Sequence, residues 1–331
     1  MFPLLLACAA PLAPDKIGPD ALTGAHDGEY SVPDWKDREF LLHLPPGYAV
    51  GTAIPVVFAF HGGGGEKEGV DRTGCAGGDT DADNCLLALA DREGFAVVMP
   101  DGVDKPGIGK RSWNAGGGEN GFRCVGGEAC DSGSDDVAYV DRLLAEVRRA
   151  VSVDDDRVYA TGISNGAAMT HRLACERADT FAAIAPVAGA NQAEAVPGCA
   201  PTRPVPVLHI HGTEDPCWGW DGDIVTALCE NDGDGRFTDV DTSMAGWRAR
   251  NGCTGTTEEA LPDAADDGTT ATRVSGTGCV ADTVLVRVDG GGHTWPGGWA
   301  YLGEDLIGLV AQDFSGNEEI WSFFEGHPRE R

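Results

Sequence analysis

The sequence predicts an α/β fold in which a mostly parallel sheet carries helices on both faces. Short continuous apolar runs, such as residues 54–60 and 95–99, are typical of strands that are buried on both faces. Segments with a helical spacing of apolar residues lie between such runs, and strands that alternate with helices favour a parallel sheet. No internal repeat and no Pro- or Ser-rich linker interrupts the chain. We therefore expect an N-terminal segment (residues 1–25) followed by a single domain (residues 26–331) with long loops.

In the N-terminal half, residues 38–44 are the first expected strand, because a Pro-Pro-Gly sequence ends this run. The second strand, residues 54–60, breaks into a run of glycines. Residues 85–93 have the pattern of a helix that a glycine terminates, and residues 95–99 form the next strand. Residues 103–134 are Gly-rich and lack periodicity, which is typical of a long functional loop.

In the C-terminal half, Ser134 is expected to cap a helix whose apolar residues recur with helical spacing as far as residue 147. The polar tract at residues 254–278 is interpreted as an insertion on the surface. The other expected elements are strands at residues 157–161, 181–187, 205–210 and 284–288, and helices at residues 167–174, 238–250 and 318–325.

The charge balance excludes one class of partner. The chain has 24 basic and 53 acidic residues, a formal net charge of −29. So acidic a surface repels phosphate backbones, which excludes nucleic acid as a partner. No apolar run approaches the ~20 residues of a membrane-spanning helix, so no transmembrane span is expected.

The eleven cysteines favour an exported protein, extracellular or on the outer cell surface, because cytosolic enzymes seldom carry so many. Residues 4–8 resemble the end of a bacterial lipoprotein signal and suggest a lipid anchor at Cys8, although no basic residue precedes them. Ten cysteines then remain for disulfides. A local pairing scheme is one solution, but sequence alone does not fix it; its pairs are Cys75/Cys85, Cys124/Cys130, Cys175/Cys199, Cys217/Cys229 and Cys253/Cys279.

A nucleophile is predicted at Ser164, within the G-x-S-x-G pattern of residues 162–166. A strand precedes the pattern and a helical segment follows it, as a strained strand-to-helix turn requires. The glycine run after the second strand, His61–Gly65, has the sequence of an oxyanion-binding loop. Its expected donors are the backbone N–H groups of Gly63 (or Gly64) and Asn165. For both Gly-rich patterns, residues 162–166 and 61–65, the alternative interpretation is an ordinary Gly-rich turn.

A serine hydroxyl needs a histidine to take its proton and an acid to orient that histidine. In the chain order Ser, acid, His, the acid and the base follow later strands. Asp215 and His293 stand in these positions, with Glu214 as the rival acid. His61 is expected to make structural hydrogen bonds instead, and His209 and His211 are expected to lie in the core or behind the site.

A calcium site is a further hypothesis for residues 230–241. Three acidic residues occupy positions 1, 3 and 5 of a loop, a glycine follows at 6, and an acidic residue stands at 12, as in an EF-hand loop. The alternative is a simple helix cap in an acidic chain. The candidate ligands are Glu230, Asp232, Asp234 and Asp241.

Several blocks together resemble the secreted polyhydroxybutyrate depolymerase-like esterases, which are related to feruloyl and acetylxylan esterases of carbohydrate esterase family 1. The resemblance runs from about Arg38 to the C-terminus. The blocks are Arg111-Ser-Trp-Asn114, Ser134-Asp-Asp-Val137, residues 157–166, Phe181-Ala-Ala-Ile-Ala-Pro186, His211-Gly-Thr-Glu-Asp215 and Gly291-Gly-His-Thr-Trp-Pro-Gly-Gly298.

This resemblance implies an α/β-hydrolase fold and ester hydrolysis through an acyl-enzyme. It makes Ser164 the nucleophile, His293 the base and Asp215 the orienting acid, and it implies no required cofactor. It also places Trp113 and Trp295 near the substrate. Trp218 lies close to the expected acid in the sequence, and such aromatic faces suit a sugar ring or a phenolic acyl group. The alternative for these residues is aromatic packing against loops.

The sequence therefore predicts an exported serine carboxylesterase. Its expected substrates are feruloyl or acetyl esters of polysaccharide, or short hydroxyalkanoate polyesters. Two alternatives remain at this stage: a serine peptidase of the same fold, and a non-catalytic, calcium-dependent surface-binding lipoprotein.

Overall fold

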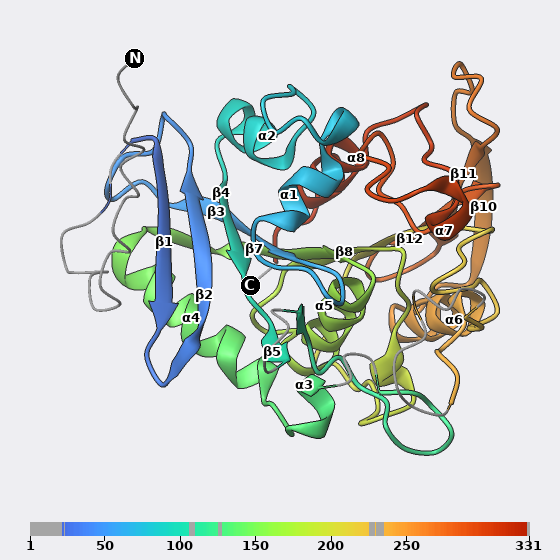
Figure 1. The fold of residues 1–331 in the computed structure, drawn as a ribbon, viewed down its shortest axis with the longest axis horizontal. Helices are drawn as coiled ribbons and strands as arrows, with labels where there is room; N and C mark the ends of the chain where they lie inside the picture. Colours follow the sequence, from blue (N-terminus) through green and yellow to red (C-terminus); the bar gives the residue numbers. More distant parts are fainter. Residues whose placement is uncertain are drawn as a thin grey trace, which may run out of the picture.

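The computed structural model describes residues 22, 24–105, 110–124, 128–224, 229 and 235–329 (Figure 1). Its main strands are β1 (His26–Val32), β2 (Trp35–Leu44), β3 (Ile54–Phe60), β4 (Ala96–Pro100), β7 (Val153–Ile163), β8 (Ala183–Val187), β9 (Val207–Gly212), β10 (Gly255–Ala260), β11 (Thr270–Thr277) and β12 (Thr283–Asp289). A small separate hairpin consists of β5 (Val103–Lys105) and β6 (Lys110–Ser112).

Within the described part of the chain, the ten main strands form one sheet in the order β1-β2-β4-β3-β7-β8-β9-β12-β11-β10. Every pairing from β4 through β12 is parallel, and the pairings at both outer edges are antiparallel. The central strands β3, β4, β8 and β9 are buried along their whole length. This arrangement confirms the mostly parallel sheet that their apolar runs predict.

The helices cover both faces of the sheet, as Figure 1 shows. Alternate side chains of β3 point to opposite faces, so Phe58 and Phe60 pack with one layer while Val57 and Ala59 pack with the other. The first layer contains α4 (Asp136–Ala150), α5 (Asn165–Glu176) and α6 (Val240–Arg250); the second contains α1 (Gly69–Gly74), α2 (Leu86–Glu93) and α8 (Gly316–Glu325). The remaining short helices are η1 (Ala76–Gly78), α3 (Glu128–Asp131), η2 (Gln192–Glu194) and α7 (Glu304–Ile307).

Several local expectations are wrong. Strand β1 precedes the run expected to be the first strand, and residues 103–134, expected to be a loop, contain β5, β6 and α3. The polar tract at 254–278 contains β10 and β11, which extend the sheet as an antiparallel hairpin, so it belongs to the sheet edge. Because every residue of β10 is exposed, this strand lacks the apolar alternation that identifies a half-buried strand. The cap of α4 is Asp135, whose carboxylate accepts the Ala138 N–H, whereas the Ser134 hydroxyl donates to Asp136.

Five disulfides join the ten cysteines of the described residues. Their pairs are those of the local scheme: Cys75–Cys85, Cys124–Cys130, Cys175–Cys199, Cys217–Cys229 and Cys253–Cys279. Cys8, the residue expected to carry a lipid, lies outside the described residues. Among the helices that the structure describes, none combines the length and apolar character needed to cross a bilayer.

Candidate active site

The predicted nucleophile occupies a strained turn between β7 and α5. Ser164 has φ 59° and ψ −121°, a backbone conformation that a non-glycine residue seldom adopts. Both glycines of the motif face the carbonyl oxygen of Phe60, which a Cβ at Gly162 or Gly166 would approach to 2.7 or 2.3 Å. The G-x-S-x-G pattern is therefore required by close backbone packing. The Ser164 side chain remains partly exposed.

The predicted acid and base contact each other directly. His293 Nδ1 lies 2.7 Å from Asp215 Oδ2, and the two residues are 4% and 3% exposed. The other carboxylate oxygen, Asp215 Oδ1, accepts the backbone N–H groups of Cys217 and Trp218, each at 2.8 Å. With Nδ1 donating to the carboxylate, a neutral His293 has its lone pair on Nε2, the atom that a general base uses. The rival acid, Glu214, is exposed to solvent.

The three residues lie at the same edge of the sheet. Ile163, Val187, Ile210 and Val286 are neighbours across β7, β8, β9 and β12, all of which run parallel. Ser164, Asp215 and His293 follow three of these strands, so the topology brings their loops together at the carboxyl edge. Among the described residues, no hydrogen bond joins the Ser164 hydroxyl to His293. Such contacts are often long in ligand-free enzymes and tighten when substrate binds.

The glycine loop lies beside Ser164. A Cβ on Gly62 would lie 3.4 Å from that of Ser164, and one on Gly63 would lie 3.6 Å from that of Asn165. The Gly64 N–H donates to Arg111 O at 2.7 Å and is therefore engaged. Within the part of the chain that the structure describes, the N–H groups of Gly63 and Asn165 have no acceptor. Of the two alternatives for the loop donor, the geometry favours Gly63.

A buried histidine holds this loop. His61 Nε2 accepts the Gly102 N–H at 2.9 Å, so the neutral ring donates from Nδ1 to Gly62 O at 2.7 Å. Burial lowers the pKa of His61 to about 4, which keeps the ring neutral. The expected structural role of His61 is confirmed.

Trp113 connects the glycine loop to Asn165, the residue after Ser164. Its indole N–H donates to His61 O at 3.0 Å. The Asn165 side chain binds the backbone of Trp113 twice: it accepts the Trp113 N–H at 2.7 Å and donates to Trp113 O at 2.9 Å. Sequence reasoning did not identify this function of Asn165, because it depends on a contact between residues 52 positions apart.

The three tryptophans that are expected near the substrate are buried, which favours the alternative of packing against loops. Trp113, Trp218 and Trp295 are 0%, 2% and 1% exposed. Trp113 packs edge-on against Phe60, and Trp218 stacks on Phe237 while its indole N–H donates to Thr238 O. These rings fill the interior behind the site, because the loops that carry them fold over their apolar faces.

Tyr301 contacts the backbone of the predicted base. Its hydroxyl donates to the backbone oxygen of His293 at 3.0 Å. Burial raises the pKa of this phenol, and the nearby Asp215 charge acts in the same direction. The His293 N–H also donates to Ile307 O, so the loop that carries the base is held on both sides of the peptide chain.

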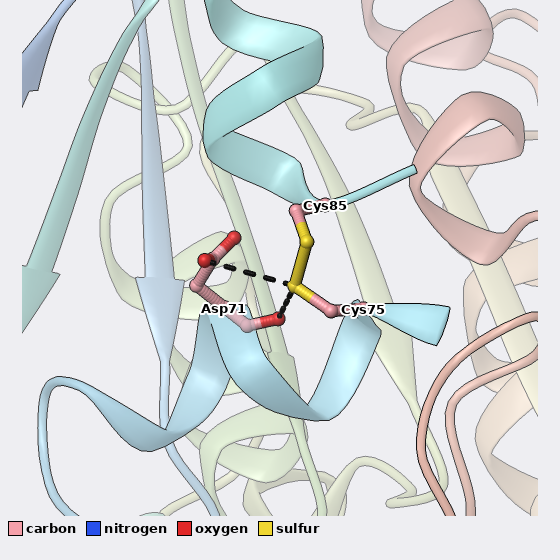
Figure 2. A group of neighbouring side chains, drawn as sticks. All are labelled: Asp71, Cys75 and Cys85. Carbon is pink, nitrogen blue, oxygen red and sulfur yellow. Dashed lines mark hydrogen bonds between the residues drawn. A yellow bond between two sulfur atoms is a disulfide. The ribbon is translucent and has the colours of Figure 1, made fainter. Parts of the chain in front are cut away.

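The calcium hypothesis falls largely outside the described residues, which exclude Glu230, Asp232 and Asp234. Asp241 lies exposed in the first turn of α6, where its carboxylate accepts the Trp220 indole N–H at 3.2 Å. Figure 2 shows a different group of metal-ligand types, Asp71 with Cys75 and Cys85. Its two sulfurs form a disulfide, and the Asp71 carboxylate accepts the Leu87 N–H at the start of α2. This group is thus structural.

Comparison with known proteins identifies the family. Residues 38–203 match the family described as Esterase PHB depolymerase. NocK of Nocardia uniformis subsp. tsuyamanensis, whose name assigns it to the esterases, is 32% identical over 307 residues, 88% of this chain and 80% of NocK. Feruloyl esterase B of Piromyces equi is 28% identical over 233 residues, 68% of this chain but 38% of that enzyme.

Among solved structures, the acetyl xylan esterase of Aspergillus awamori matches with a TM-score of 0.51 at 15% identity, covering 87% of this chain and 94% of that one. At this identity the match bears on the fold alone, which is the α/β-hydrolase fold that the resemblance implies. The chain belongs to the Esterase PHB depolymerase family and is a carboxylic ester hydrolase by that membership.

Proposed function

From this membership and the geometry of the site, we propose that the chain is an exported serine carboxylesterase that works through an acyl-enzyme. The observation that carries the proposal is the buried 2.7 Å contact between Asp215 and His293, at the sheet edge where Ser164 occupies its strained turn. A carboxylate that fixes one ring nitrogen leaves the other free to take a proton. The reaction needs no cofactor.

In the proposed mechanism, the Ser164 hydroxyl attacks the ester carbonyl while His293 Nε2 takes its proton. The oxyanion of the tetrahedral intermediate receives the N–H groups of Gly63 and Asn165, each worth about 2.7–4 kcal/mol in such sites. His293 then donates the proton to the leaving alcohol, and the acyl group stays on Ser164. Water, activated by the same histidine, releases the acid and restores the serine.

The proposed substrates are feruloyl or acetyl esters of polysaccharide, or short hydroxyalkanoate polyesters. The names of relatives support the first group, because they include feruloyl esterases and an acetylxylan esterase. The family description supports the second. The net charge of −29 favours neutral esters over polyanions, since an acidic surface repels anionic substrates.

Export is proposed from the cysteines. Ten of the eleven pair in the described structure, and disulfides persist in oxidising compartments. Quantifying free thiols in protein purified from its native host would test this, because mostly reduced cysteines would contradict export.

The catalytic assignment is tested with Ser164→Ala. We expect p-nitrophenyl acetate turnover to fall by at least about 10³-fold with an unchanged melting temperature, because the variant loses only the nucleophile. Ser322→Ala, at an exposed position of α8, is the matched control and should retain wild-type turnover. Turnover by Ser164→Ala equal to that of the control would contradict the proposal.

The substrate class is tested with methyl ferulate, acetylated xylan and hydroxybutyrate oligomers, compared by kcat/KM. We expect one of these ester groups to exceed p-nitrophenyl acetate, because binding of the natural acyl or alcohol group lowers the transition-state barrier. Cleavage of peptides in preference to every ester would favour the peptidase alternative and contradict the ester assignment.

A further inference from the structure

Three buried histidines form a continuous chain behind the predicted acid. His171 lies on α5, and His209 and His211 lie on β9, with all three rings inaccessible to solvent or nearly so. His171 Nε2 is 3.2 Å from His209 Nδ1, and His209 Nε2 is 3.0 Å from His211 Nδ1. A ring nitrogen of each histidine therefore faces a ring nitrogen of the next, so the three rings form one row.

Both ends of the row have a fixed polarity. At one end, the Trp247 indole N–H, which can only donate, lies 3.0 Å from His171 Nδ1. At the other end, His211 Nε2 lies 2.7 Å from the carbonyl oxygen of Trp218, which can only accept. A neutral imidazole has one donor and one acceptor nitrogen. Each end thus independently requires the proton on Nε2 in all three rings.

The row ends at the peptide that holds Asp215. The Trp218 carbonyl accepts from His211, while the N–H of the same residue donates to Asp215 Oδ1 at 2.8 Å. His211 Nε2 also lies 3.5 Å from Asp215 Oδ2, the oxygen that contacts His293. The His211 N–H therefore closes the loop between β9 and Trp218 together with the Cys217 and Trp218 N–H groups that Asp215 Oδ1 accepts.

We propose that His211, with its tautomer fixed by His209, His171 and Trp247, is a positioning residue that aligns Asp215 with His293. This proposal rests on the proposed function, since Asp215 is the orienting acid only if the site is that of a serine esterase. The His211 N–H anchors the Trp218 peptide, and that peptide directs the carboxylate toward His293. With the opposite tautomer, the lone pair of Nε2 would face the Trp218 and Asp215 oxygens, and the Trp218 carbonyl would lose its donor.

The neutral state of the row also matters. A protonated His211 would place a positive charge 3.5 Å from the carboxylate and compete with His293 for it. Burial lowers the pKa of His171 to about 3 and lowers those of His209 and His211, although Asp215 opposes the shift at His211. The titratable and charged groups around the row are Asp215, His293, Arg250, and Arg287 with its partner Asp289.

The test compares His211→Gln with His211→Leu. The glutamine amide can donate from a position close to that of Nε2, whereas leucine fills similar space and donates nothing. We expect His211→Leu to lower kcat by roughly 10²-fold with KM changed less than about twofold, because misalignment acts on the transition state. The acid limb of its kcat/KM profile should move to lower pH, because the imidazolium of His293 loses part of its carboxylate partner. His211→Gln should retain most of the wild-type kcat and the acid limb of the wild-type profile.

His327→Gln and His327→Leu are the matched controls, because this half-buried histidine lies after α8 and contacts Phe323 O and Asp282. Activities are counted per fluorophosphonate-reactive site, so a loss of folded protein does not enter them. Equal rates and equal acid limbs for His211→Gln and His211→Leu would overturn the proposal. If the wild type itself fails to react at Ser164, the proposed function has failed instead.

A second measurement keeps the proposal testable if His211→Leu does not fold. Two-bond ¹⁵N–¹H correlation spectra of the ¹⁵N-histidine-labelled protein report the tautomer of each ring. We expect protonated Nε2 and bare Nδ1 in all three rings between about pH 5 and about pH 8. Trp247→Phe removes one end of the row but leaves the Trp218 carbonyl at the other end, so this variant should keep the same pattern at His211 and His209. Protonated Nδ1 on His211, in the wild type or in Trp247→Phe, would overturn the proposal.

Discussion

The two halves of the site are held in different ways. The Ser164 half, residues 61–65, 111–114 and 162–166, combines close backbone packing with hydrogen bonds of the His61 and Trp113 side chains; a Cβ on Gly166 would lie only 2.3 Å from Phe60 O. The acid–base half, residues 209–218 and 291–301, is fixed by buried rings that donate and accept in a set order. Close backbone packing is therefore specific to the first half, whereas a row of neutral histidines with one proton arrangement is specific to the second. Side-chain changes should therefore affect the two halves differently.

The largest effect is expected in the acid–base half. Asp215→Asn retains the shape of the side chain but removes the charge and allows the wrong His293 tautomer, so kcat should fall by about 10⁴-fold. Glu214→Gln, at the exposed neighbouring position, should change kcat by less than about twofold. Steady-state kinetics with p-nitrophenyl acetate would check both. A larger loss in Glu214→Gln would reverse the assignment of the acid.

A smaller effect is expected in the Ser164 half. Trp113→Phe keeps an aromatic ring against Phe60 but removes the indole N–H from His61 O, which then lacks its buried partner. We expect kcat to fall roughly tenfold with little change in KM, because the loop that carries Gly63 becomes less well aligned. Trp35→Phe is the control, since that ring packs on Tyr139 outside both halves. Equal kinetics for the two variants would show that the Trp113 contact does not align the loop.

The smallest effect concerns stability against pH. The pKa of His61 is lowered from 6.5 to about 4 in the folded protein, so the unfolded chain takes up protons that the folded one does not. The stability from a neutral His61 is therefore complete above about pH 6.5 and is lost as pH falls toward about 4. Urea unfolding across this window should show a shallower decline for His61→Gln than for the wild type. Parallel declines would mean that His61 does not contribute.

The sequence predicts much of this architecture because the relevant signals are local. The strand at residues 54–60 has the predicted bounds, since a buried strand reads as a continuous apolar run. Ser164, Asp215 and His293 each follow a recognisable strand, and parallel strands bring their carboxyl ends to one edge. The order of strands and motifs along the chain was therefore enough to predict that these three residues lie near one another.

The features that sequence analysis did not predict depend on tertiary contacts. Loops that fold over Trp113 and Trp218 determine how far these side chains are exposed. The sequence around a tryptophan near a motif does not show whether its ring is buried or exposed. The histidine row requires the contact between α5 and β9, because His171 and His209 are 38 positions apart. The edge strand β10 has polar side chains on both faces, so no hydrophobic pattern identifies it.

The most direct test of the central claim is covalent labelling of the nucleophile. A fluorophosphonate reacts with an activated serine hydroxyl, forming a Ser–O–P bond and releasing fluoride and a proton. Peptide mass spectrometry of the wild type should place one phosphonyl group on Ser164, and His293→Ala should label at least about 10²-fold more slowly. Labelling at another serine, or equal rates in the wild type and His293→Ala, would contradict the assignment of Ser164 and His293.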